Sequence, residues 1–207
     1  MTEPHQLAIE TSSRRGAVAL GCGDRIVDVA HLPDRPRASL DLMAVIDTLT
    51  RTHGVAPRDL DELYLSLGPG SFTGLRIAVS TAKVLARSLG VKLVGVPTLD
   101  VLCQQHPDAV VALNVKRNTA WSAGPGLPPG LRAVEEIKTL GFPMIADTID
   151  GATPAEPDVR VVYELGRAAA AEDRYDDPLS LTPLYVRQPE AVTLWDQRHG
   201  PPENSTP

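Results

Sequence analysis

Short apolar runs separated by polar and glycine-containing turns fill the first hundred residues, and they predict strands. Three of these runs are typical of a hairpin meander, because only a few residues separate one from the next. Two further runs, Leu63 to Leu67 and Val91 to Val96, predict strands with longer segments between them. The meander strands are expected at Gln6 to Glu10, Ala17 to Gly21 and Arg25 to Ala30.

Two of the longer segments carry apolar residues at helical spacing. One helix is expected to begin near Ser39 and end before Gly54, and the other to run from Thr73 to Leu89 and end at Gly90. Strands and helices therefore alternate after the meander. This order predicts a mixed α/β sheet with helices packed against it.

The pattern after Pro97 predicts a second part of the chain. A short helix should open at Pro97 to Leu99, followed by a strand at Ala109 to Val115 and a pairing strand at Ala120 to Ala123. We expect a loop at Gly124 to Gly130, because its three prolines and three glycines disfavour helix and ladder alike. Helices are predicted within 131–140 and 159–171, and an extended arm at 183–187. The expected domains are residues 1–98 and 99–199, with a disordered tail at 200–207.

Composition narrows the classes of function. The net charge of −6, without a clustered basic stripe, argues against a surface that binds nucleic acid by itself. Cys22 and Cys103 lie far apart, which suits a reducing compartment and neither a disulfide framework nor a zinc site. Without a leader-like start or an apolar run of about 20 residues, a cytoplasmic protein that binds no membrane is expected. Scattered histidines and the absence of HExxH and GxSxG patterns predict no metal site, no catalytic residues and no hydrolase chemistry.

Two segments have residues that could bind phosphate. Glu10, Thr11 and Ser12 supply the carboxylate and hydroxyls that a magnesium and phosphate site of an actin-like ATPase uses. The alternative is an ordinary turn capped by a hydroxyl, and the residue types alone favour the turn by roughly three to one. We therefore predict a weak or relic nucleotide site at most.

The second segment is the glycine-rich run from Ser66 to Arg76, which joins a predicted strand to a predicted helix. It lacks the lysine of a Walker sequence. Two interpretations stay open, a structural turn and an anion site at a helix N-terminus. The residues that shape this loop are Gly68, Gly70, Ser71 and Gly74.

The two predicted helices carry more apolar surface than one packed stripe requires. On the second helix, Ala78, Ala82 and Ala86 repeat every four residues and would allow close approach by another helix. We favour a subunit interface over a helix pair buried within the chain. The candidate interface residues are Leu40, Met43, Ala44, Ile46, Asp47, Arg76, Val79, Lys83 and Arg87.

Three segments together resemble the bacterial TsaB (YeaZ) family. They are Leu7 to Ser12, the specific GPGSFTGLR run within Ser66 to Arg76, and Val94 to Leu99, and the resemblance returns at Pro183 to Arg187. It implies an α/β fold of the actin-like ASKHA (ribonuclease H-like) type with two lobes. It also implies membership of the machinery that installs N6-threonylcarbamoyl on adenosine 37 of tRNA.

In that machinery the resemblance implies a non-catalytic subunit that binds TsaD, which carries the transfer chemistry, and works with TsaE, which supplies ATPase activity. The family pairs with TsaD or with itself through the two helices at residues 39–53 and 73–89. No cofactor is required by this chain, ADP or ATP would bind at the complex interface, and tRNA would be reached only through the complex. A homodimer is the alternative when the chain is alone.

The second half departs from the family pattern. The run from Asn114 to Asn118 stands where the family has Asp-Ala-Arg, and the short, proline-rich region 124–159 predicts a shortened second lobe. Whether that lobe accepts TsaE stays open. Three rival functions are an autonomous ASKHA-type ATPase or kinase, a glycoprotease and a self-associating regulatory module. The missing acid disfavours the first, and the lack of a metal or nucleophile site disfavours the second.

Overall fold

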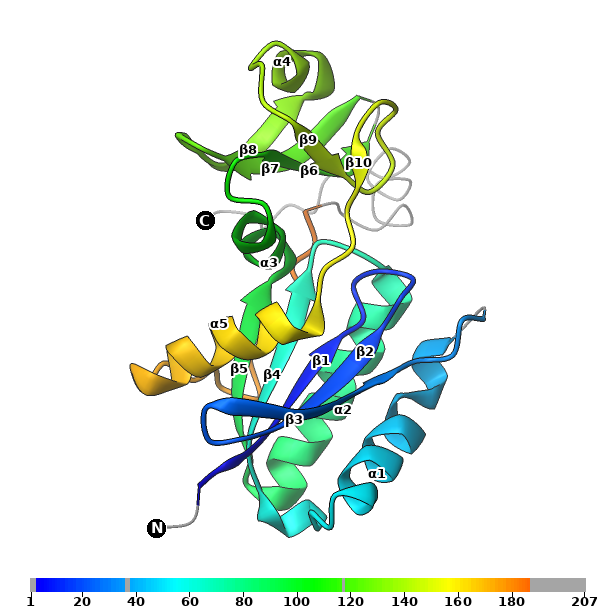
Figure 1. Ribbon diagram of the computed structural model, residues 1–207, viewed down its shortest axis with the longest axis vertical. Helices are drawn as coiled ribbons and strands as arrows, with labels where there is room; N and C mark the ends of the chain where they lie inside the picture. The colour runs from blue at the N-terminus through cyan, green and yellow to red at the C-terminus, as the bar shows by residue number, and fades with distance from the viewer. Residues whose placement is uncertain (1–2, 36–37, 117, 187–207) are drawn as a thin grey trace, which may run out of the picture.

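The computed structural model describes residues 3–35, 38–116 and 118–186, and within them the chain forms two mixed five-stranded sheets (Figure 1). In the first sheet the strands lie in the order β3-β2-β1-β4-β5. The meander β1-β2-β3 is antiparallel, whereas β4 and β5 pair in parallel beyond β1. The strands are β1 (His5–Glu10), β2 (Ala17–Cys22), β3 (Arg25–His31), β4 (Leu60–Gly68) and β5 (Lys92–Pro97). The predicted mixed α/β sheet is confirmed.

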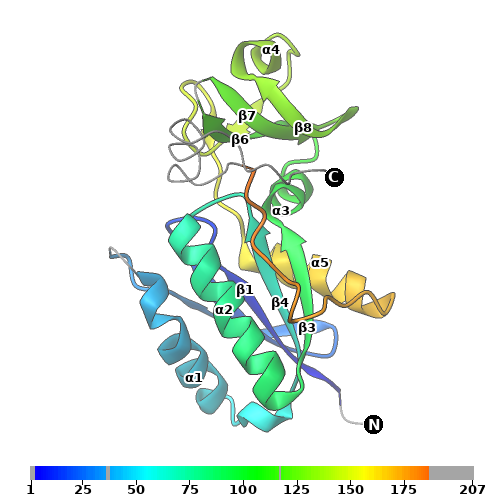
Figure 2. The same cartoon turned by 180° about the vertical axis from the view of Figure 1, so that it is seen from behind.

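Two long helices cover one face of this sheet. Helix α1 (Leu42–Thr52) follows the short 3-10 turn η1 (Ala38–Asp41) and packs against β2 and β3, and α2 (Phe72–Leu89) packs against β4 and β5. A second 3-10 turn, η2 (Pro57–Asp59), leads into β4. The two helices lie side by side over one apolar core that they share with the sheet (Figure 2). The outer sides of α1 and α2 therefore lie on the same face of the first lobe.

The opposite face is covered by α5 (Val159–Ala171), although this helix comes after the second sheet in the chain. Tyr163 fixes it there, since its hydroxyl lies 3.2 Å from Gln6 Oε1 and 3.2 Å from the Gly23 carbonyl oxygen. The Tyr163 ring also meets Tyr64 edge to face, with centroids 5.8 Å apart. The range 99–199 expected as the second domain thus includes a helix that packs on the first sheet, while the predicted boundary itself stays a prediction.

The second sheet has the strand order β10-β9-β6-β7-β8. Helix α3 (Thr98–Gln105) contacts β6 and β7 of this sheet and also α5, so it lies between the two lobes (Figure 1). The antiparallel pairing of β6 with β7 confirms the predicted partner strands. The elements are β6 (Val110–Lys116), β7 (Thr119–Gly124), β8 (Leu127–Ala133), α4 (Val134–Lys138), β9 (Met144–Ala146) and β10 (Thr153–Pro154).

The predicted loop at Gly124 to Gly130 is wrong for most of its length, because β8 begins at Leu127. β8 is an edge strand, where prolines without N–H groups are tolerated. The Arg132 guanidinium also holds it, donating to Pro128 O at 2.8 Å and to Ser122 O on β7 at 3.0 Å. The helix predicted within 131–140 is correspondingly shortened to α4.

The C-terminal strap, residues 174–186, returns along the β5 edge and beside α2 (Figure 2). Asp176 N donates to Leu93 O at 2.8 Å, Leu181 enters the core under α2, and Leu184 N donates to Leu67 O at 2.8 Å. This is the predicted extended arm, and Arg187 and the predicted tail 200–207 lie outside the described residues. No helix among the described residues is both long and apolar enough to cross a bilayer.

Candidate functional site

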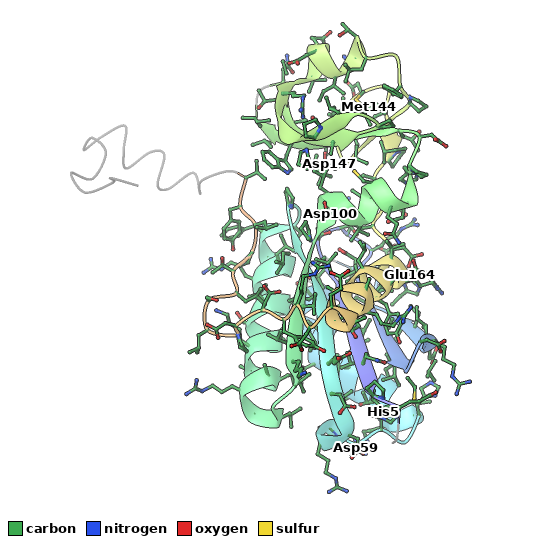
Figure 3. All side chains as sticks on the ribbon, turned by 90° about the vertical axis from the view of Figure 1, so that its left-hand side faces the viewer. His5, Asp59, Asp100, Met144, Asp147 and Glu164 are labelled. Carbon is green, nitrogen blue, oxygen red and sulfur yellow. The ribbon has the colours of Figure 1, made fainter. Side chains whose placement is uncertain are left out.

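A cavity of about 950 Å³ lies between the two lobes. Its first wall is formed by the β1–β2 turn and the glycine-rich loop, and its second by residues of β6 and by Asp147 and Thr148. Figure 3 shows Asp147 between the second sheet and α3, the helix that carries Asp100. The exposed pair Arg15 and Glu156 spans the lobes with 3.3 Å between Nη1 and Oε2. Of the three residues of the predicted weak nucleotide site, Ser12 lines this cavity, whereas Glu10 and Thr11 do not.

Glu10 is completely buried at the end of β1. Its Oε1 accepts hydrogen bonds from Ser12 N and, at 2.6 Å, from Ser12 Oγ, whereas its Oε2 has no hydrogen-bond partner among the described residues. Burial raises the pKa of the Glu10 carboxyl above its ordinary value, and the hydrogen bonds from Ser12 offset part of that rise. Thr11 and Ser12 are buried as well. The carboxyl therefore closes its own turn instead of facing the cavity.

The glycine-rich loop packs directly on this turn. Ser71 N donates to Ser12 O at 2.6 Å, and Ser71 Oγ accepts from Gly74 N at 3.3 Å as the N-cap of α2. A Cβ atom on Gly70 would meet Ser12 O, and one on Gly74 would meet Thr11 O, both below the 3.0 Å limit of real Cβ contacts. Gly68 has a φ of +102°, which only glycine adopts readily. These contacts favour the structural interpretation of the loop over the anion site.

The residues do not fit a magnesium nucleotide held between the turn and the loop. The two backbones are in direct contact, which leaves no space for a phosphate between them, and the Glu10 carboxyl that would hold the metal is buried with a raised pKa. Across the described part of the chain, no group of three His, Cys, Asp or Glu side chains is placed to hold a metal ion. The run from Asn114 to Asn118, which replaces the family's Asp-Ala-Arg, gives no further argument about a nucleotide site. The side chains of Asn114 and Lys116 lie outside the described residues.

The buried Glu10 carboxyl predicts a measurable pH effect. A raised pKa in the folded state means that Glu10 contributes stability below its unfolded pKa, which is lost as the pH rises through the folded pKa. Glu10→Gln keeps an oxygen for Ser12 and removes the ionisation, so we expect its melting temperature at pH 7 to exceed that of the wild type by about 2–4 °C. The gain should vanish near pH 4 in thermal unfolding followed by circular dichroism. An equal shift at both pH values would contradict the buried, raised-pKa carboxyl.

The nine predicted interface residues separate into exposed and buried groups. Leu40, in η1, is 67% exposed, and Met43, in the first turn of α1, is 49% exposed. Ile46 and Val79 are each only 4% exposed and belong to the core under the helices, so the interface prediction is corrected at these two positions. The other five keep exposed or half-exposed side chains: Ala44, Asp47, Arg76, Lys83 and Arg87.

The alanine repeat on α2 has a role within the chain. Ala78, Ala82 and Ala86 are buried in the shared core, and the helix packs on β4 and β5. Small residues at four-residue spacing allow a helix to approach a neighbour closely, and that neighbour is the chain's own sheet. The expectation that this row faces another subunit is therefore wrong.

Several exposed apolar side chains on the α1–α2 side were missed. Val84 on α2 is 63% exposed and Leu179 on the strap is 73% exposed. Val84 lies about half a helical turn from the buried alanine row, on the polar side of α2. An apolar residue at that position could have indicated an exposed contact surface from the sequence alone. The strap residues gave no such signal, since only the folded chain brings them beside α2. The other exposed apolar residues of α2 and the strap are Phe72, Leu184 and Tyr185.

We define the docking face as the exposed outer side of η1, α1 and α2 with the adjoining strap.

Comparisons with known proteins agree with the fold beneath it. A profile for TsaD, tRNA N6-adenosine threonylcarbamoyltransferase, matches residues 37–115. The tRNA threonylcarbamoyladenosine biosynthesis protein TsaB of Bacillus subtilis is 32% identical over 108 residues, 51% of this chain and 47% of that protein. An uncharacterized protein of Mycobacterium tuberculosis is 30% identical over 153 residues, 66% of this chain and 68% of its own length.

The solved structure of YeaZ from Pseudomonas aeruginosa superimposes with a TM-score of 0.69 at 19% identity, covering 88% of this chain and all of that one. The chain belongs to the TsaB (YeaZ) family. The match confirms the predicted α/β fold, here with two five-stranded sheets. The chain spans about half the length of some curated relatives, 47% of Bacillus subtilis TsaB and 48% of an uncharacterized Mycobacterium leprae protein.

Proposed function

We propose that this chain is a non-catalytic scaffold of the machinery that forms N6-threonylcarbamoyladenosine at position 37 of tRNA. Its contribution is to bind and activate a TsaD-type threonylcarbamoyltransferase. Support comes from the TsaB family relationship and from the name of the profile that matches residues 37–115. The observation that carries the proposal is the docking face, where Leu40, Met43 and Val84 remain exposed although the cores beneath both helices are filled.

The cleft supports a binding role in preference to an autonomous ATPase or kinase. The backbones of turn and loop are in direct contact, so they leave no space between them for the phosphate site that such an enzyme would hold there. ADP or ATP would instead be held at the interface with the partner, and TsaE would join the assembled complex. With a net charge of −6, tRNA would be contacted through the partner, in the cytoplasm.

Deleting the gene tests the proposal in the organism of origin. Threonylcarbamoyladenosine in bulk tRNA, measured by nucleoside mass spectrometry, should fall to background and return when the full chain is expressed again. The nucleoside is expected to disappear because the transferase is inactive without its scaffold, although the scaffold itself performs no chemistry. Unchanged nucleoside in the deletion strain would remove the assignment.

A further inference from the structure

Two partly exposed aromatic side chains line the cavity between the lobes. Phe72, the first residue of α2, is 45% exposed, and Tyr185, near the end of the strap, is 43% exposed. Figure 2 shows the strap running beside α2 toward the second lobe. The two ring centroids lie 5.2 Å apart, with 38° between the ring planes. In a chain with only 4% aromatic residues, two exposed rings in contact at one cavity indicate a binding surface.

The second lobe contributes apolar side chains to the same cavity. Leu113 and Val115 of β6 line it, together with Pro154 of β10. Sites for small molecules are mostly apolar with a few polar groups, and their volumes are about 300–1,000 Å³. The cavity, at about 950 Å³, falls within this range. A planar molecule bound against the two aromatic rings would therefore contact both lobes.

Hydrogen bonds hold two sides of the cavity in place. On the strap side, Leu184 N donates to Leu67 O at 2.8 Å. On the side of the second lobe, Gln105 of α3 donates through Nε2 to Glu156 O at 3.1 Å and accepts through Oε1 from Asp158 N at 3.0 Å. A ligand therefore has little of the cavity wall to order, and a preformed site binds more tightly for that reason.

The charges around the cavity disfavour two classes of ligand. Among the described residues that line it, acidic side chains outnumber basic ones by three to two, which disfavours a polyanion such as a nucleotide. The acids are Asp34, Asp147 and Glu156, and the bases are Arg14 and Arg15. An organic cation is disfavoured at the rings, because Arg76 Cζ already lies 5.0 Å from the centroid of the Phe72 ring.

We propose that the cavity between the lobes binds a small, uncharged molecule with a planar aromatic ring. The ring stacks on Phe72 and Tyr185, and its other side contacts β6 of the second lobe. Aromatic rings gain from offset or tilted packing in addition to the area that they bury. Because the ligand contacts both lobes, its binding favours the arrangement of the lobes in which the cavity is formed. The inference goes beyond the proposed function, since it assigns a ligand to the chain without its partner.

The test measures binding of prodan, a neutral planar naphthalene dye whose emission shifts to the blue in apolar sites, to the full-length chain. We expect saturable binding that Tyr185→Ala and Val115→Asp each weaken at least about tenfold, as is typical of central contact residues. Tyr185→Phe keeps the ring and should bind like the wild type. Phe142→Ala is the matched control, because Phe142 is also 45% exposed but does not line the cavity. Circular dichroism should show that each variant is folded.

The results that would overturn the proposal are distinct. Equal dye affinity for the wild type and Tyr185→Ala, or an equal loss in Phe142→Ala, would place the dye outside the cavity. Displacement of the dye by ATP with magnesium would show a nucleotide site instead of a site for an uncharged ligand. A wild type that binds no dye would overturn the proposal as well. None of these results bears on the proposed function, which depends on binding of the partner.

Discussion

Gly74→Ala is expected to destabilise the protein by about 2 kcal/mol, even though alanine is the better helix former. Helix propensity alone predicts a gain of about 1 kcal/mol for this change within α2. The added Cβ would, however, overlap Thr11 O, a backbone atom held by the β1–β2 turn. Overpacking against backbone costs about 1–3 kcal/mol and occasionally more, so the packing effect should dominate.

Helix propensity and overpacking would change the free energy of unfolding in opposite directions, so thermal and urea unfolding show which of the two dominates. We expect a fall in melting temperature of about 4–8 °C, from about 2–4 °C per kcal/mol for a chain of this size. Thr73→Ala, at the exposed neighbouring position in the same turn, is the control and should change the melting temperature little. A more stable Gly74→Ala protein would show that turn and loop are not in contact.

Placing aspartate at two exposed apolar positions of the docking face is expected to weaken partner binding about 100-fold or more. Met43→Asp and Val84→Asp put charges where the proposal buries apolar side chains, and an unpaired charge in an interface core is costly. Neither change touches the core, and an acid in the first turn of α1 suits the helix dipole. Val79→Asp would be uninformative, because Val79 lies in the core and its loss would unfold the chain.

Leu131→Asp provides the matched control for this pair. Leu131 is 56% exposed, comparable to Met43 and Val84, but lies on the edge strand β8 of the second lobe. Titration calorimetry with the purified partner should give wild-type affinity for Leu131→Asp and strongly reduced affinity for the double variant. Equal affinities for both variants would place the partner on another surface.

Local patterns predicted the first lobe well. Alternating apolar runs gave the meander, and helical spacing gave α1 and α2, because each of these elements buries a regular apolar face. The return of α5 to the first sheet could not be read from local sequence. Its position depends on Tyr163 reaching Gln6 and Tyr64, which lie about a hundred residues or more away in the chain.

The second lobe shows how a tertiary contact overrides composition. Prolines and glycines disfavour regular structure, but Pro128 and Gly130 lie in an edge strand that needs few of its own N–H donors. Arg132 supplies donors to the carbonyl oxygens that the ladder leaves free. From the sequence alone, Arg132 does not indicate that its side chain will bind these carbonyl oxygens and support a strand.

The docking face was only half predictable for a geometric reason. Excess apolar residues on the two helices correctly indicated exposed apolar surface, but could not say which residues face the sheet. Ile46 and Val79 face it, while Val84 does not. The strap adds residues 179–185 to the face through a hydrogen bond from Leu184 to Leu67, which brings together positions far apart in the chain.

The most direct test of a scaffold that acts through its docking face is complementation of the deletion strain. Threonylcarbamoyladenosine per tRNA should return to the wild-type level with the wild-type chain and with Leu131→Asp, and stay near background with Met43→Asp/Val84→Asp at equal protein abundance. Full restoration of the nucleoside by the docking-face variant would contradict the account.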